Sequence, residues 1–205
     1  MKLDRKKHWE LVYETKNPDQ VSWTQETPTT SLDFIRSFRL EKTAKIIDIG
    51  GGDSKLVDYL LDEGFENITV LDISATALEK AKTRLGEKAT KVTWIVCDII
   101  DFEPTTTFDV WHDRAAFHFL TTTEQIKKYI KTARKSVSGF LTIGTFSQNG
   151  PKKCSGLEIK QYTENELTLE LKDGFDKIKC ITEDHLTPFD TKQHFLFCSF
   201  KRQQR

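Results

Sequence analysis

Residues 45–54 read Lys-Ile-Ile-Asp-Ile-Gly-Gly-Gly-Asp-Ser, and this stretch decides the fold. The run of isoleucines is typical of a buried parallel strand, and the glycines after it allow a sharp turn and a close approach to a ligand. A second apolar stretch, Ile68 to Leu71, ends at Asp72, which lies 22 residues after Gly50. A carboxylate at that strand end is placed to accept hydrogen bonds from both hydroxyls of a ribose. The two stretches together predict a nucleoside site.

The glycine turn does not fit a dinucleotide-binding fingerprint, because Gly-x-Gly-x-x-Gly needs a glycine at position 55 and the chain has Lys55 there. It reads Asp-x-Gly-x-Gly-x-Ser from Asp48 to Ser54 instead. On this motif the chain resembles the class I S-adenosylmethionine-dependent methyltransferases. Asp72 matches the ribose acid of that family, and Asp98 matches the acid beside the adenine. The resemblance implies S-adenosylmethionine as cofactor and S-adenosylhomocysteine as product.

A third part of the resemblance follows an expected strand over 108–111. The segment Trp111 to Leu120 contains Trp-x-Asp-Arg, which is similar to thiopurine-type methyltransferases, and Asp-Arg-x-x-x-x-x-Leu, which looks like one branch of protein lysine methyltransferases. The resemblance therefore implies methyl transfer to a small-molecule acceptor with an N, O or S nucleophile. A protein lysine acceptor is the alternative, and a protein that binds the cofactor without catalysis is a second alternative.

Residues just after successive parallel strands converge on one crevice, and the family's motifs add neighbours to them. The expected cofactor contacts are Trp9, Tyr13, Trp23, Asp48, Gly50, Gly51, Gly52, Ser54, Asp72, Ile73, Asp98, Ile99 and His112.

The region before the first strand is rich in aromatic residues. Trp9 and Tyr13 have helical spacing, and Trp23 follows them. These rings can either cover the edge of the sheet as plain packing or form a lid that keeps water away from the cofactor's sulfonium. We expect a single domain over 1–205, with an aromatic lid segment over 1–40 and a Rossmann-like core over 41–205.

Methyl transfer from a sulfonium is an in-line displacement that mainly needs the acceptor held about 3 Å from the methyl carbon, with water excluded. An acceptor that carries a proton also needs a base. Asp113 and His118 are the candidate catalytic residues, and an exposed Asp113 would attract a cationic acceptor. Arg114 can orient an acidic substrate. The alternative is structural: Asp113 pairs with Arg114, and His118 packs between neighbouring phenylalanines.

The four cysteines lie far apart, with no Cys-x-x-Cys pair and no histidine at metal-finger spacing, so we expect reduced thiols and no metal. Cys154 falls in a Gly-Pro loop expected over the mouth of the site, where it serves the loop or touches the substrate.

Strand and helix patterns alternate along the chain, which predicts an α/β, doubly wound, mostly parallel sheet with helices on both faces. The resemblance implies seven strands, the last antiparallel. We expect helices over 56–61, over 74–85 with Ser74 as N-cap and Gly86 as stop, from a capping box at 121–124 to near Gly139, and from 163. Further strands are expected over 92–96, 140–146, 178–181 and 195–200.

Composition limits the partners. Thirty-one basic residues balance thirty-one acidic ones, so no overall field recruits nucleic acid or an anionic membrane. No run of about 18 uncharged apolar residues occurs. We expect a soluble, cytoplasmic protein, most simply a monomer, that binds neither nucleic acid nor membrane.

Overall fold

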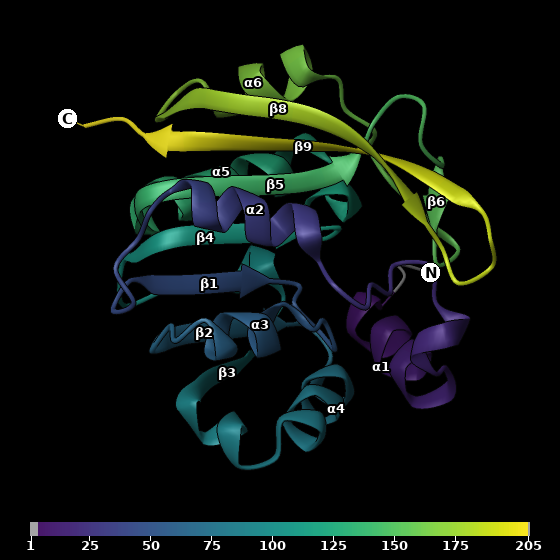
Figure 1. The fold of residues 1–205 in the computed structure, drawn as a ribbon. Coiled ribbons are helices and arrows are strands. Elements are labelled where there is room, and N and C mark those ends of the chain that lie inside the picture. The colour runs from purple at the N-terminus through teal and green to yellow at the C-terminus, as the bar shows by residue number, and fades with distance from the viewer. Residues whose placement is uncertain (1–3, 205) are drawn as a thin grey trace.

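A computed structural model describes residues 4–204 (Figure 1). Its centre is a seven-stranded sheet in the order β3-β2-β1-β4-β5-β9-β8. The strands are β1 (Lys45–Ile49), β2 (Asn67–Asp72), β3 (Val92–Val96), β4 (Phe108–Arg114), β5 (Val137–Phe146), β8 (Phe175–Leu186) and β9 (Lys192–Arg202). Strands β1 to β5 are parallel, whereas β9 runs antiparallel to both of its neighbours. The predicted fold class is confirmed. A separate small ribbon pairs β6 (Lys153–Cys154) with β7 (Leu157–Glu158).

Helices cover both faces of this sheet. They are α1 (Arg5–Thr15), α2 (Thr29–Ser37), α3 (Leu56–Asp62), α4 (Ala75–Leu85), α5 (Thr123–Ser136) and α6 (Glu164–Leu171), with short 3-10 turns η1 (Pro18–Gln20), η2 (Gly86–Lys91), η3 (Ile99–Asp101) and η4 (Phe117–Phe119). Apolar residues of α2, α3 and α4 form one core with Ile46 and Val110. Those of α5 and α6 form the other core with Ile47 and Trp111. Successive side chains of each central strand thus pack alternately into the two cores, as expected for a doubly wound sheet.

Most helix ends follow their local signals. Helix α4 starts after Ser74, whose hydroxyl accepts from the Ala77 N–H at 3.1 Å, and its C-cap is Gly86 at φ +58°. Helix α6 has the predicted capping box of Thr163 and Glu166. The box of α5 lies one residue later than predicted, with Thr122 as N-cap and Gln125 as its partner. That helix stops at Ser136 because the chain enters β5 at Val137.

Strand β4 is longer than predicted, and this changes the site. We expected it to end at Trp111 because His112, Asp113 and Arg114 are polar. The strand continues through them because β1 pairs with it as far as Asp113, and β5 as far as Arg114. Strands β1 and β5 supply the hydrogen-bond partners for the backbone N–H and C=O groups of these residues, so the polar side chains do not end the strand. Successive side chains in this stretch therefore point to opposite faces of the sheet.

The prediction of four reduced cysteines is wrong. Cys180 of β8 and Cys198 of β9 form a disulfide bond, since antiparallel pairing places them directly opposite each other. Cys97 and Cys154 are free thiols. The separation of 18 residues along the chain gave no hint of this contact, which exists only once the hairpin forms.

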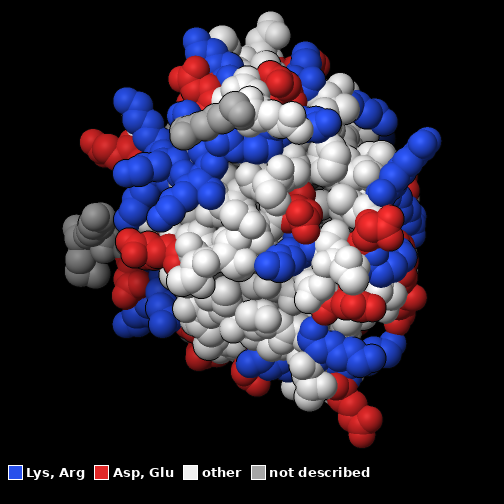
Figure 2. Space-filling model, turned by 90° about the vertical axis from the view of Figure 1, so that its left-hand side faces the viewer, with Lys and Arg blue, Asp and Glu red and all other residues white. Residues whose placement is uncertain are grey.

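Two surface features bear on partners. Among residues 4–204 no helix has both the length and the apolar character to cross a membrane. Figure 2 shows the side of the molecule on which the parallel strands begin, and basic and acidic side chains are both distributed over it. The parallel strands end on the opposite side of the molecule.

Candidate active site

A cavity of about 720 Å³ lies at the carboxyl ends of the parallel strands. Helix α1 lies beside this edge of the sheet, to the right in Figure 1. All the residues predicted to contact the cofactor line the cavity except Gly52. A Cβ added to Gly52 would lie 2.6 Å from the Tyr13 hydroxyl, so this glycine makes room for a lining residue. The crevice predicted at the strand ends therefore corresponds to the cavity.

The glycine turn brings backbone to the cavity wall. Gly50 has a φ of +65°, which an L side chain rarely adopts. A Cβ on Gly51 would lie 2.6 Å from Asp48 Oδ2 and 2.7 Å from Val70 Cγ1. Only glycine fits there without movement of these two buried side chains.

Asp72 ends β2 and is buried in the cavity wall. Its Oδ1 accepts from the Ser74 N–H at 2.8 Å. Burial raises the pKa of this carboxyl to about 7; the Asp48 charge also raises it, while backbone N–H groups of Ser74 and Gly52 oppose the rise. Hydrogen-bond donors of a ligand would therefore stabilise the ionised form of the Asp72 carboxyl.

Asp98 lies after β3 and accepts from the Ile100 N–H at 3.2 Å, so it caps η3. Its Oδ2 is 3.7 Å from Nη1 of Arg5 in α1. Arg5 lines the cavity and was not predicted, because only the docking of α1 brings it to this strand end.

A buried chain of hydrogen bonds joins Asp48, His112 and Ser31. His112 Nδ1 donates to Asp48 Oδ1 at 2.7 Å, and Nε2 lies 2.9 Å from the Ser31 hydroxyl. The hydroxyl of Ser31 can donate or accept, so it can partner Nε2 in either role. All three side chains line the cavity, and sequence reasoning missed Ser31.

The aromatic side chains of the N-terminal segment form one cluster over the cavity. The Trp9 ring lies 5.6 Å from the Trp23 ring and 5.1 Å from the Phe119 ring, and the Tyr13 ring lies 6.2 Å from that of Trp23. Such edge-to-face contacts stabilise the cluster beyond the area that it buries. The same residues line the cavity, so these rings both pack against one another and cover the cavity.

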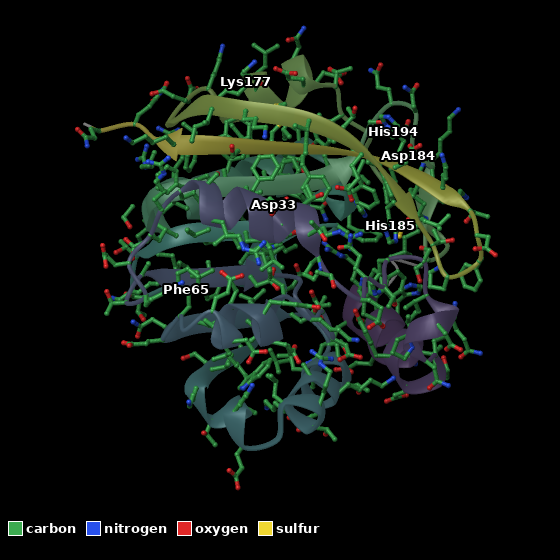
Figure 3. All side chains as sticks on the ribbon, in the orientation of Figure 1. Asp33, Phe65, Lys177, Asp184, His185 and His194 are labelled. Atoms are coloured by element: carbon green, nitrogen blue, oxygen red, sulfur yellow. A yellow bond between two sulfur atoms is a disulfide. The ribbon has the colours of Figure 1, made fainter. Side chains whose placement is uncertain are left out.

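Glu10 and His185 form hydrogen bonds that help to hold this segment in place. Glu10 of α1 accepts from the Ser74 hydroxyl at 2.8 Å and from the N–H groups of Ala75 at 2.8 Å and Thr76 at 3.0 Å. It thereby caps α4. On the other side, His185 Nε2 donates to the Ser22 carbonyl at 2.7 Å. Figure 3 shows His185 in the part of the β8–β9 hairpin that reaches toward the N-terminal segment.

The structure corrects the placement of both predicted catalytic residues. Asp113 is fully buried and points away from the cavity, where it accepts from Tyr129 Oη at 2.8 Å and from the Phe117 N–H at 3.0 Å. Strand alternation is the reason, because His112 faces the cavity. His118 is fully buried with its ring 4.5 Å from that of Phe146, and neither ring nitrogen has a partner among residues 4–204. Neither residue lines the cavity.

We expect His118→Phe to stabilise the protein. The change removes two buried, unpartnered ring nitrogens, a gain of about 1–2 kcal/mol, measurable by urea unfolding. Burial lowers the pKa of His118 to about 3, and the Arg114 charge adds to this. Below about pH 6.5 the imidazole of His118 therefore binds a proton in the unfolded chain but not in the folded chain. The free energy of unfolding of wild type decreases for this reason as pH falls, whereas His118→Phe lacks this contribution.

His185→Phe is the matched control, because His185 has a hydrogen-bond partner and its loss should destabilise. A stable His118→Phe protein that binds the cofactor but transfers no methyl group would contradict this account and restore His118 as a base.

The comparisons with known proteins agree with this geometry. A family model described as methyltransferase domain matches residues 46–138. The crystal structure of the N-methyltransferase NodS from Bradyrhizobium japonicum WM9 with S-adenosylhomocysteine superposes with a TM-score of 0.75, at 17% identity, over 95% of this chain and 98% of that one. Residues 46–138 thus match a methyltransferase domain, and the chain shares its fold with solved S-adenosylmethionine-dependent methyltransferases.

Relatives of this methyltransferase carry different names. Zebrafish (Danio rerio) EEF1A lysine methyltransferase 2 is 25% identical over 87% of this chain and 78% of its own length. Malonyl-[acyl-carrier protein] O-methyltransferase of Anoxybacillus flavithermus is 34% identical over 49% of this chain and 38% of its own. The chain spans 17% of the mouse eEF1A lysine and N-terminal methyltransferase. The acceptors of these proteins differ in kind.

The cofactor of this methyltransferase is S-adenosylmethionine, and the cavity fits it on structural grounds. Two strand-end carboxyls, Asp72 and Asp98, stand beside a turn at which Gly51 has no space for a side chain. Carboxylates can accept hydrogen bonds from ribose hydroxyls and adenine amino groups, and backbone without a side chain lets a ligand come close to the turn.

Proposed function

We propose that this methyltransferase transfers the methyl group of S-adenosylmethionine to a small molecule held in the cavity. The observation that carries this proposal is the continuous cavity, which runs from Asp98 past Asp72 and Gly50 to Phe119 and Cys154 beneath the aromatic cluster. At about 720 Å³ it falls within the range of roughly 300–1,000 Å³ typical of small-molecule sites.

Each part of the wall has a proposed task. Asp72 holds the ribose and Asp98 the adenine end, while the glycine turn and Asp48 organise the methionine end. Trp9, Tyr13 and Trp23 exclude water and face the sulfonium with their rings. S-adenosylmethionine, when bound, supplies an activated methyl group. Since Asp113 and His118 lie outside the cavity, the proposal assigns catalysis to positioning and water exclusion.

Protein lysine is the second candidate acceptor, because the zebrafish relative named for lysine methylation matches over 87% of this chain. A lysine side chain would have to enter the same cavity. Asp113, the acid expected to attract an ammonium group, does not line the cavity and is bonded to Tyr129 instead.

A labelled-methyl assay tests the proposal. The purified chain and S-adenosylmethionine with a labelled methyl group are incubated with a lysate, which is then separated into protein and small molecules. We expect label in the small-molecule fraction. Label confined to protein would support the lysine alternative, and label in neither, with cofactor still bound, would indicate a binding protein without catalysis.

The cytoplasmic location, the absence of nucleic-acid partners and the monomeric state stay predictions. The Cys180–Cys198 disulfide weighs against a reducing compartment, where such bonds are rare. Alkylation of free thiols in freshly lysed cells, followed by mass spectrometry, measures whether the pair is oxidised in place.

A further inference from the structure

Arg114 is the last residue of β4 and lines the cavity, and its guanidinium forms no ion pair with the residues that the structure describes. Nη1 donates to the Trp23 carbonyl at 2.9 Å. Nε and Nη2 are buried, and across residues 4–204 they meet no hydrogen-bond partner. No carboxylate in that part of the chain forms an ion pair with Arg114. A buried cation in this state is costly unless a ligand brings the opposite charge.

The neighbours of Arg114 do not neutralise it. Burial raises the pKa of Cys154 to about 11, so that thiol is uncharged at neutral pH. The Glu183 carboxylate accepts from the Thr30 hydroxyl. The charges of Glu183 and Asp48 favour the charged form of Arg114, but neither carboxylate forms an ion pair or a hydrogen bond with its guanidinium. The Phe195 ring, 5.0 Å away, offers a cation–π contact, which is weaker than a desolvated ion pair. Burial lowers the pKa of Arg114 to about 10, which leaves it charged at neutral pH.

The strand order places Arg114 away from the nucleoside end. The strands β3, β2, β1 and β4 are consecutive in the sheet. Asp72 and Arg114 are the last residues of β2 and β4, and Asp98 and Gly50 come after β3 and β1. Adjacent strands are about 4.8 Å apart, so Arg114 stands about 10 Å across the sheet from Asp72, beyond the glycine turn. Cys154 and Phe119 line the same end of the cavity. This is the side on which an acceptor would meet the methyl group.

We propose that Arg114 binds an anionic group of the acceptor, a carboxylate in its simplest form, and so selects small acidic acceptors. The inference rests on the proposed function, because it names the substrate class of the same site. It also explains why a lysine ammonium is a poor fit: the charge that faces the cavity here is positive, and the acid that would attract a cation, Asp113, is bonded to Tyr129 on the other face. The planar guanidinium suits a carboxylate with two parallel hydrogen bonds.

Thermal unfolding tests the anion site without any methyl transfer. We expect Arg114→Met to melt about 2–4 °C above wild type when no ligand is present, because it removes a buried charge that forms no ion pair while keeping the volume of the side chain. Sodium formate should raise the melting temperature of wild type more than an equal concentration of sodium chloride does, and should have no such effect on the variant. Arg36→Met is the control, since Arg36 is an exposed residue paired with Glu63. A variant that melts lower, with formate acting equally on both proteins, would show a structural role only.

A second experiment separates acceptor from cofactor. Small molecules of a lysate are divided by ion exchange into anionic, cationic and neutral pools, and each is offered with labelled S-adenosylmethionine. We expect label only in products from the anionic pool, about a hundredfold less with Arg114→Met, partial recovery with Arg114→Lys, and S-adenosylhomocysteine affinity by calorimetry within about twofold of wild type.

Three results would overturn the inference. A parallel loss of S-adenosylhomocysteine affinity in Arg114→Met would assign the guanidinium to the cofactor's own carboxylate. Label from the cationic pool, the neutral pool or protein would exclude an acidic acceptor. Label in no fraction would overturn the proposed function and the acceptor role with it, and the formate result would still show whether Arg114 binds anions.

Discussion

Asp72→Asn should weaken S-adenosylhomocysteine binding by about a hundredfold at pH 8. Two ribose hydroxyls can each donate to an ionised carboxylate, and hydrogen bonds to a charged group contribute about 1.5–3 kcal/mol each. Asparagine has the size of aspartate, but its side chain has only one oxygen that can accept a hydrogen bond. Its amide N–H₂ group is a donor, so the second ribose hydroxyl loses its acceptor. Loss of about 3 kcal/mol corresponds to the expected factor. Isothermal titration calorimetry measures it.

The pH dependence of binding identifies the carboxylate. Burial raises the pKa of Asp72 to about 7 in the ligand-free protein, and ribose hydroxyls favour the ionised form. Wild-type affinity should therefore rise as pH increases toward about 7 and level off above it, whereas Asp72→Asn should show no such rise.

Folding stability should change in the opposite sense. Because the folded pKa of Asp72 lies above its unfolded value, the folded state holds this proton more tightly, and wild-type stability falls as pH rises from about 4 to 7. Asp72→Asn removes that loss and should be the more stable protein at pH 8 without ligand. Asp101→Asn, at an exposed residue paired with Lys128, is the matched control. Equal affinity of Asp72→Asn and wild type would remove Asp72 from the ribose site.

The parts of the fold that were predictable depend on local signals. Ser74 and Gly86 bounded α4 correctly, since an N-cap and a left-handed C-cap act within one turn of the helix. The isoleucines of β1 and the aspartate at the end of β2 also predicted their strands correctly. The pairing of Cys180 with Cys198 was not, because it depends on the register of two strands that meet only in the folded sheet.

The misplacement of Asp113 has its origin in β4. Its polar end was taken as a loop, so His112, Asp113 and Arg114 were all free to face the crevice. Extension of the strand by these residues would have predicted the outcome from alternation alone: His112 and Arg114 on one face, Asp113 on the other. The structure shows this arrangement, with Asp113 bonded to Tyr129. Arg5 and Ser31 could not have been found in this way, because tertiary docking of the N-terminal segment brings them to the cavity.

Glu10→Ala should release α1 from the core and open the cavity. The Glu10 carboxylate satisfies three hydrogen-bond donors at the start of α4: the hydroxyl of Ser74 and the N–H groups of Ala75 and Thr76. A carboxylate at a helix N-terminus in a partly buried site contributes up to about 2 kcal/mol, with solvent screening included. If the docked helix is the form that holds the cofactor, S-adenosylhomocysteine affinity should fall by up to about thirtyfold. Hydrogen exchange of the α1 amides should accelerate in the same variant, whereas exchange in α5 should not change.

The effect should depend on pH in a defined direction. Burial alone would raise the pKa of Glu10, but hydrogen bonds from Thr76, Ala75 and Ser74 outweigh it and lower the pKa to about 2. A depressed folded pKa means that the contribution of Glu10 is complete above its unfolded value of about 4.5 and is lost as pH falls toward 2. Wild type and Glu10→Ala should thus converge in acid. Glu14→Ala, one helical turn along on the exposed side of α1, is the control. If α1 exchanges no faster in Glu10→Ala than in Glu14→Ala, the aromatic cluster alone holds the helix, and Trp9 and Trp23 become the residues to test.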